Sequence, residues 1–174
     1  MKHLKRTIIV LLFVIIGLFP VAATALEVGS LAPGFTLKSV QGQDVSLADF
    51  KGRLVLLKLA TTWCPTCKQL SAEIHKASQL LQEKDVVVLE VFVQDSKTMI
   101  EEYLGDAEPP MTFHALLDDG QVYDAYNVYL IPRLLVIDAG QIVRFESAGR
   151  NVLADDIKSM VEEFSLPVAT AGPS

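Results

Sequence analysis

Two short apolar runs, 54–60 and 86–93, flank a stretch in which apolar residues recur every three or four positions. The runs have the length and composition of strands buried on both faces of a sheet. The apolar positions of 67–81 lie on one face of an amphipathic helix. Strand, helix and strand in this order predict a βαβ unit, whose two strands are parallel.

Shorter patterns predict the remaining elements. Residues 35–37 and 44–47 lie on either side of a Gln-Gly-Gln turn and predict a β-hairpin ahead of the βαβ unit. Residues 134–137 and 141–145 flank an Asp-Ala-Gly turn and predict a second antiparallel hairpin. Further elements are expected as a short strand at 113–117 and as helices at 96–104, 121–127 and 153–164.

The two ends of the chain differ from its middle. Residues 1–25 have a basic start, an apolar core and an Ala-Thr-Ala cleavage site, the pattern of a secretory signal peptide. The apolar core is shorter than the roughly 18 residues that span a bilayer. Cleavage is therefore expected, and retention of the segment as a membrane anchor is the alternative. Residues 26–167 are expected to form one domain, followed by a flexible tail at 168–174.

Export and charge restrict the partners. Removing the signal takes away three of the 15 Lys and Arg residues and none of the 21 Asp and Glu residues. The remaining chain is strongly acidic, which argues against nucleic acid and anionic lipid surfaces as partners. We expect a monomer in the periplasm or another extracytoplasmic space, where disulfides persist.

The sequence Trp-Cys-Pro-Thr-Cys contains both cysteines of the chain, Cys64 and Cys67. Their spacing places the two side chains one helical turn apart on one face, within the separation that a disulfide requires. Because the run 54–60 leads into the motif, Cys64 is predicted to lie at a helix N-terminus, where unpaired N–H groups stabilise a thiolate. This arrangement is typical of a redox dithiol in which Cys64 attacks and Cys67 resolves.

Other uses of two cysteines at this spacing fit less well. A zinc site needs four ligands, and His75 and His114 do not supply them at a finger-like spacing. Haem attachment needs a histidine after the second cysteine, where Lys68 stands. A structural disulfide is the remaining alternative, although so short a loop stabilises a fold only weakly. We expect no metal and no organic cofactor.

The order of strand, W-C-x-x-C, helix and strand, followed by a proline, a hairpin and a closing helix, resembles the thioredoxin fold. More narrowly, the chain resembles exported thiol–disulfide oxidoreductases of the TlpA/ResA type over roughly residues 28–165. The matching residues are 32–33, 35, 37, 42, 47, 51–52, 60–67, 123–128, 131–132, 135–138, 140 and 149. The resemblance implies an α/β, three-layer fold with a central mixed sheet flanked by helices and an N-terminal β-hairpin extension.

The resemblance also implies an enzyme, a protein-disulfide oxidoreductase that serves cell redox homeostasis. Its partners would be exported proteins that carry a disulfide or dithiol, with a reductant role, as in cytochrome c maturation, favoured over an oxidant role. An upstream, membrane-bound thiol reductant is implied too. One alternative is a peroxiredoxin-like thiol peroxidase, whose motif Thr61 matches but Leu57 does not, because a proline belongs there. A non-catalytic thioredoxin-like binding domain is another.

Several residues around the cysteines receive roles from the resemblance. Trp63 would shield the disulfide and contact the partner, unless it serves only packing. Pro65 and Thr66 would set the local geometry and the reduction potential. Pro132 is implied to be a cis proline that faces the dithiol, and the backbone of Ile131 to dock the substrate strand.

Two positions depart from the family pattern near the site. Leu70 replaces a glutamate that such relatives often carry, so a proton-handling role of that residue does not transfer. Arg133 follows the proline, where threonine is usual. It would either turn toward Cys64 and lower the pKa of the thiol or select acidic substrates, or point outward as a solvated charge.

The third departure concerns two charges in the apolar runs. Lys58 and Glu90 stand where thioredoxins have a buried Asp and Lys, so the signs are exchanged. An unpaired buried charge costs several kcal/mol. We therefore expect the two residues to pair beneath the disulfide and to handle protons during exchange. In the alternative, both extend to the end of the sheet and serve only packing.

Overall fold

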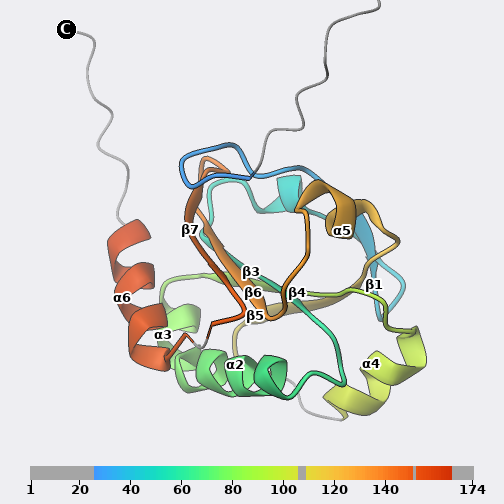
Figure 1. Ribbon diagram of the computed structural model, residues 1–174. Helices are drawn as coiled ribbons and strands as arrows, with labels where there is room; N and C mark the ends of the chain where they lie inside the picture. The colour runs from blue at the N-terminus through green and yellow to red at the C-terminus, as the bar shows by residue number, and fades with distance from the viewer. Residues whose placement is uncertain (1–25, 106–108, 151, 166–174) are drawn as a thin grey trace, which may run out of the picture.

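The computed structural model describes residues 26–105, 109–150 and 152–165, and the predicted signal peptide and tail lie outside them. A seven-stranded sheet forms the centre of the molecule (Figure 1). No helix within the described ranges is long and apolar enough to cross a bilayer. The strands are β1 (Thr36–Ser39), β2 (Asp44–Ser46), β3 (Val55–Ala60), β4 (Val87–Phe92), β5 (Thr112–Leu117), β6 (Arg133–Ile137) and β7 (Val143–Ala148). The helices are η1 (Leu47–Phe50, a 3-10 turn), α2 (Pro65–Lys76), α3 (Ser78–Glu83), α4 (Lys97–Leu104), α5 (Gln121–Ala125) and α6 (Ala154–Phe164).

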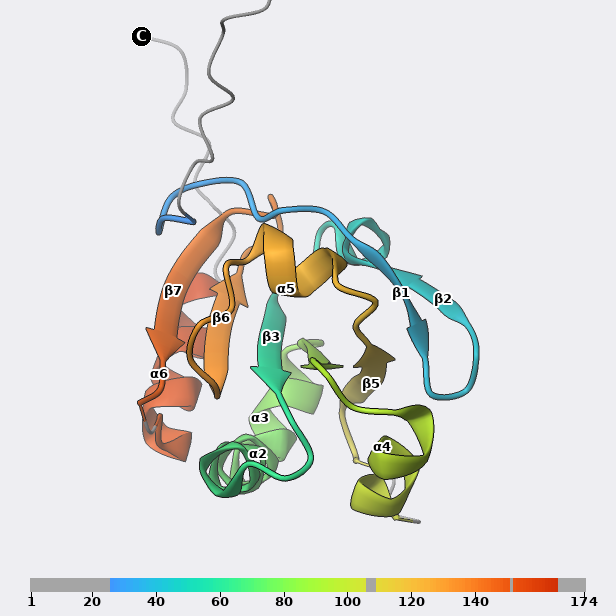
Figure 2. The ribbon, with the colours of Figure 1, turned by 45° about the vertical axis from the view of Figure 1, so that its right-hand side comes forward.

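The sheet is mixed, as predicted, and its strand order is β2-β1-β5-β4-β3-β6-β7. β3, β4 and β5 are parallel, whereas β6 pairs with β3 in the antiparallel sense. Helices α2, α3 and α6 lie on one face, and α5 lies on the other (Figure 2). Each face therefore has its own apolar core, and the central strands carry apolar side chains on both sides.

Both predicted hairpins are present. β1 and β2 pair antiparallel, and β1 also pairs with β5 through Lys38 and Ser39. The N-terminal hairpin is thus an edge of the main sheet. β6 and β7 form the second hairpin, with a register irregularity between Val136 and Ile137.

The predicted helix at 67–81 is interrupted, which corrects the expectation of one continuous helix. α2 ends at Lys76 and α3 begins at Ser78, with the buried Ala77 between them. The Ala77 N–H donates to the carbonyls of Glu73 and Ile74, so the last turn of α2 is tightened. Ala77 keeps a right-handed backbone (φ −89°, ψ −1°), and the apolar periodicity consequently continues across the break.

His114 in β5 should make folding pH-dependent. Its ring centroid lies 5.4 Å from that of Phe50. Burial, and secondarily the charge of Arg53, lowers the pKa of His114 below its ordinary value of 6.5. Because the unfolded chain then binds the proton more readily, stability is lost as pH falls below about 6.5.

We expect the free energy of unfolding to decrease between pH 7.5 and pH 5.5, measured by urea denaturation. The decrease should be smaller in His114→Gln, which cannot titrate. If the free energies of unfolding of the two proteins depend on pH in the same way, groups other than His114 cause the dependence.

Candidate active site

Cys64 and Cys67 form a disulfide at the start of α2, with their Cα atoms 5.2 Å apart. Cys64 is the N-cap residue, and the Cys67 N–H donates to Cys64 Sγ at 3.2 Å. Pro65 occupies the first turn, where its missing N–H costs nothing, and Thr66 Oγ1 lies 3.3 Å from Cys64 Sγ. Cys64 is 6% exposed and Cys67 1%. The predicted helix start and the predicted order of exposure are both confirmed.

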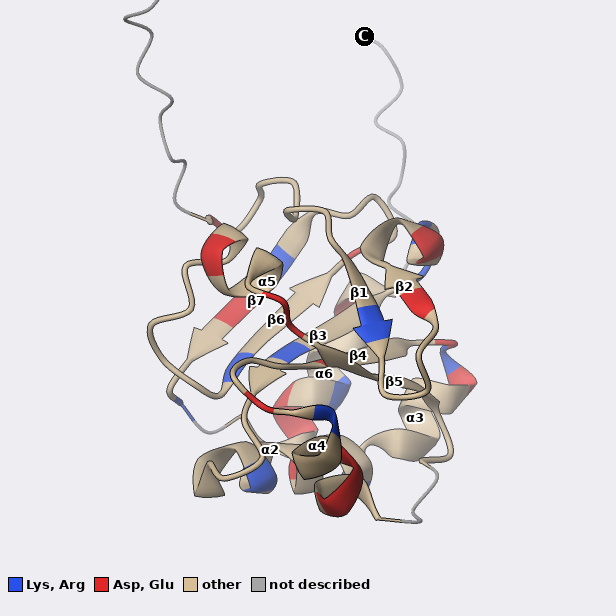
Figure 3. Ribbon diagram, turned by 90° about the vertical axis from the view of Figure 1, so that its right-hand side faces the viewer, with Lys and Arg blue, Asp and Glu red and all other residues tan. Residues whose placement is uncertain are grey.

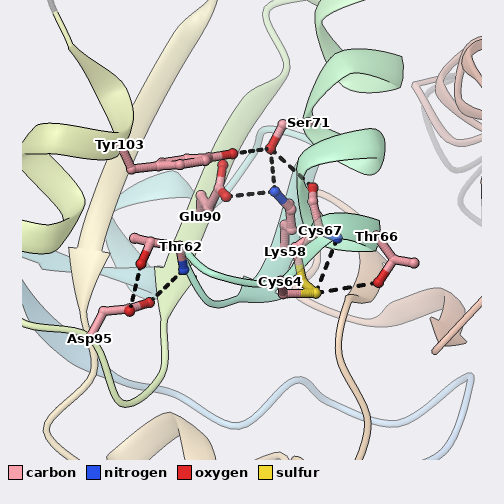
Figure 4. A network of polar contacts seen from close by, with 9 residues as sticks. All are labelled: Lys58, Thr62, Cys64, Thr66, Cys67, Ser71, Glu90, Asp95 and Tyr103. Carbon is pink, nitrogen blue, oxygen red and sulfur yellow. Dashed lines mark hydrogen bonds and ion pairs between the residues drawn. A yellow bond between two sulfur atoms is a disulfide. The ribbon is translucent and has the colours of Figure 1, made fainter.

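The segment before Cys64 is fixed by a residue that the sequence analysis did not single out. Asp95 accepts hydrogen bonds from the N–H and the hydroxyl of Thr62, at 2.8 and 2.9 Å (Figure 4). Thr62 follows β3 and Asp95 follows β4, and these strands are parallel neighbours. The carboxyl ends of parallel neighbouring strands meet at one edge of the sheet. Polar residues directly after the apolar runs 54–60 and 86–93 could therefore have predicted the contact between Thr62 and Asp95.

The loop between α5 and β6 reaches the disulfide from the other side. The Ile131–Pro132 peptide bond is cis, as the resemblance implied. Ile131 packs against the cluster of Ala60, Cys64 and Cys67. The residue before the proline is therefore in contact with the redox pair.

Large apolar side chains lie exposed near this site. Trp63 is 60% exposed, so most of its surface is not covered by packing within the protein. Tyr129 and Leu130, which precede Ile131 in the loop, are 84% and 61% exposed. Apolar surface thus flanks the disulfide on both the Cys64 side and the Pro132 side, an arrangement suited to contact with another polypeptide.

Lys58 and Glu90 form an ion pair inside the sheet. They are direct partners in the β3–β4 register, and Lys58 Nζ lies 2.5 Å from Glu90 Oε1. Their side chains are 0% and 5% exposed, and the central strands carry few other charges (Figure 3). The predicted pairing is confirmed, and the alternative in which both extend to the end of the sheet is wrong.

The pair belongs to a larger network that reaches the redox helix (Figure 4). Lys58 Nζ also donates to Ser71 Oγ, and Ser71 Oγ donates to the Cys67 carbonyl at 3.3 Å. Ser71 Oγ lies 3.0 Å from Tyr103 Oη of α4. Burial, and secondarily the charge of Glu90, raises the pKa of Tyr103. Ser71, Glu90 and Tyr103 line a pocket of about 390 Å³ between α2, α4 and β5.

The position of Arg133 differs from both expectations, that it faces Cys64 and that it points into solvent. The residue is buried at 6% exposure, so it is not a solvated charge. Its guanidinium donates to the carbonyls of Tyr126 and Asn127 and pairs with Glu146 at 2.7 Å. None of these contacts involves Cys64. The side chain instead follows the face of the sheet that α5 covers.

Metal-ligating side chains are scattered. Across the described residues, no group of three or more His, Cys, Asp or Glu side chains is placed to hold a metal ion.

Comparison with known proteins places these features in a family. A model described as the AhpC/TSA family matches residues 28–146, which is more than half of the chain. The chain belongs to the AhpC/TSA family. One member of similar sequence is the thiol-disulfide oxidoreductase ResA of Geobacillus thermodenitrificans, 32% identical over 92% of this chain and 95% of the relative.

Other similar proteins are also named for thiol–disulfide chemistry. The thiol:disulfide interchange protein DsbE of Pseudomonas fluorescens is 26% identical over 90% of this chain and 91% of its own. The thioredoxin domain of a thiol-disulfide oxidoreductase from Bacteroides vulgatus superposes with a TM-score of 0.69 at 22% identity, covering 81% of this chain and 99% of that domain. That likeness confirms the predicted thioredoxin-like fold.

These relatives and the site geometry settle the reaction class of this AhpC/TSA member. The chain is a thiol–disulfide oxidoreductase whose redox pair is Cys64 and Cys67. The peroxidase alternative is not favoured, because the similar proteins are named for disulfide exchange. Leu57, at the position of the peroxidase proline, is an ordinary buried residue of β3.

Proposed function

We propose that this protein reduces disulfides in exported proteins, including C-x-x-C-H haem-attachment sites of apocytochromes c. The observation that carries the proposal is the disulfide at the start of α2, flanked by exposed apolar side chains. The names of the relatives support exchange chemistry, and the secretory pattern of residues 1–25 supports an extracytoplasmic location. Disulfides form and persist in such a compartment, so reducing one there requires a dedicated dithiol.

The reaction transfers two electrons through a mixed disulfide. The Cys64 thiolate attacks one sulfur of the substrate disulfide, and the other substrate sulfur leaves as a thiolate that takes up a proton. Cys67 then loses its proton and attacks Cys64 Sγ. The Cys64–Cys67 bond forms, and the second substrate thiolate leaves and is protonated. The helix N-terminus and the Cys67 N–H stabilise the attacking thiolate.

The buried pair has a proposed part in the second step. The ammonium group of Lys58 donates to Ser71 Oγ, and Ser71 Oγ donates to the backbone carbonyl of Cys67 in α2. A buried ammonium group there favours negative charge on a sulfur within its field. Glu90 supplies a carboxylate in the same network that can take up the Cys67 proton. Lys58 and Glu90 thus serve proton handling, and neither touches the substrate.

Docking and regeneration complete the proposal. The backbone of Ile131, beside cis Pro132, would pair with an extended segment of the substrate next to its cysteine. Trp63 would cover that segment from the other side, while Pro65 and Thr66 tune the reduction potential. A membrane-bound thiol reductant would return the disulfide to the dithiol. The protein would act as a periplasmic monomer, either free or held by an uncleaved N-terminal segment.

The reduction potential of the Cys64–Cys67 pair tests the direction of electron flow. We expect a value at or below about −200 mV, on the reducing side of the range for such proteins. It can be measured by equilibration in glutathione buffers, alkylation of free thiols and mass spectrometry. A value near −120 mV, typical of a strong oxidant, would reverse the direction. Failure of the reduced protein to reduce a C-x-x-C-H disulfide peptide would remove haem-attachment sites from the proposed substrates.

A further inference from the structure

The side chain of Arg133 closes the loop that leads to the cis proline. Its backbone lies at the end of this loop, in β6, where it pairs with Leu59 and Ala148. Its guanidinium reaches back to the start of the loop and donates to the carbonyls of Tyr126 and Asn127. One residue therefore holds both ends of the segment 126–133, which we call the docking loop.

The partners of Arg133 explain why a buried arginine is tolerated there. The carbonyls of Tyr126 and Asn127 directly follow the short helix α5, at a point where backbone acceptors have no partner within the helix. Glu146 of β7 balances the charge at 2.7 Å. The flat fork of a guanidinium can donate to several acceptors at once, which an ammonium group cannot do with the same geometry.

Packing alone does not hold the docking loop. A pocket of about 250 Å³ lies between it and β7, lined partly by Asn127, Leu130, Arg133 and Glu146. The exposed Tyr129 and Leu130 contribute little buried surface. Tyr126 and Val128 anchor the start of the loop in the apolar core, and the hydrogen bonds of Arg133 add support for the exposed part that follows.

We infer that Arg133 is a positioning residue for protein substrates. Resting on the proposed function, the inference is that Arg133 pre-orders the docking loop. Ile131 then meets the substrate backbone, while Tyr129 and Leu130 contact apolar side chains flanking the substrate cysteine. Pre-ordering a loop before binding removes an entropic cost from association. A small disulfide reacts at Cys64 without contacting the docking loop, so pre-ordering of the loop should not change its reaction rate.

Replacement of Arg133 by methionine tests the inference through two substrates. One is a C-x-x-C-H disulfide peptide with apolar flanking residues, and the other is hydroxyethyl disulfide. We expect Arg133→Met to lower kcat/KM for the peptide about tenfold, mainly through KM. The rate with hydroxyethyl disulfide should change less than about twofold, and the pH profile of thiolate formation at Cys64 should stay in place.

Two further variants complete the experiment. Arg144→Met removes another arginine–carboxylate pair of the same hairpin, with Asp138, away from the docking loop. It should leave the peptide KM unchanged. Arg133→Lys keeps the positive charge but not the planar guanidinium with its several donors, so it should raise the KM for the peptide. This variant also tests the inference if Arg133→Met does not fold.

Three outcomes would overturn the inference. Arg133→Met with wild-type kinetics for both substrates would show that the loop needs no support. An equal loss with both substrates and a displaced thiolate profile would mean that Arg133 acts on the sulfur. Full activity of Arg133→Lys would mean that charge alone suffices. If wild-type protein fails to reduce the peptide, the proposed function fails, a result distinct from all three.

Discussion

Replacing Cys67 with alanine is expected to stop the reaction halfway and leave the substrate bonded to Cys64. Cys67 is the less exposed of the two cysteines, and its role in the proposed mechanism is to release the mixed disulfide. Without it, no thiol of the protein can attack the Cys64–substrate bond, and only the freed thiol of the peptide can reverse the first step, which alkylation of that thiol prevents. The complex should accumulate with a C-x-x-C-H peptide, and non-reducing mass spectrometry should detect it at a mass equal to protein plus peptide.

Cys64→Ala is the matched variant, because it removes the other sulfur of the same pair. It should form no complex and should not accelerate exchange, since the remaining thiol is 1% exposed and away from the helix cap. Comparable trapping by both variants would mean that either sulfur can attack. Trapping only by Cys64→Ala would reverse the assigned roles.

Lys58→Met is expected to cause the largest loss of stability among the charged positions. It leaves Glu90 in the sheet, 4% exposed and without its cation. Removing one partner of a buried ion pair typically costs about 3–5 kcal/mol. Urea unfolding of the oxidised protein should show this loss. Lys38→Met is the control, because Lys38 and Asp44 form an exposed pair worth less than about 1 kcal/mol.

The double variant Lys58→Met with Glu90→Leu separates stability from chemistry. An apolar pair of similar volume often restores or exceeds the stability of a buried ion pair. We expect recovered stability but slower release of the mixed disulfide, with an altered pH profile. A double variant with wild-type exchange rates would restrict the pair to folding.

The central features of the site were predictable because they depend on local sequence. The two cysteines lie between an apolar run and the apolar periodicity of a helix, and this local pattern places Cys64 at a helix start. Lys58 and Glu90 were predicted to meet because each is the single charge in a buried run, and neighbouring parallel strands allow one to neutralise the other.

The contacts that could not be predicted from the sequence join elements that lie far apart in the chain. The spacing of Tyr103 from Ile100 indicates the apolar face of a short helix, and nothing local shows that its hydroxyl meets Ser71. Arg133 was expected to face either the sulfur or the solvent. Its actual partners lie at the end of α5 and in β7, which no local pattern brings together.

A rapid acid quench of the wild-type reaction shows which sulfur attacks the substrate and which one releases it. Reduced protein is mixed with one equivalent of C-x-x-C-H disulfide peptide, and the quenched samples are alkylated and mapped by mass spectrometry. We expect an early peptide adduct on Cys64 alone, which decays as the Cys64–Cys67 disulfide and the dithiol peptide appear in equal amounts. An adduct on Cys67, or a peptide that stays oxidised while the protein remains reduced, would contradict the proposed mechanism.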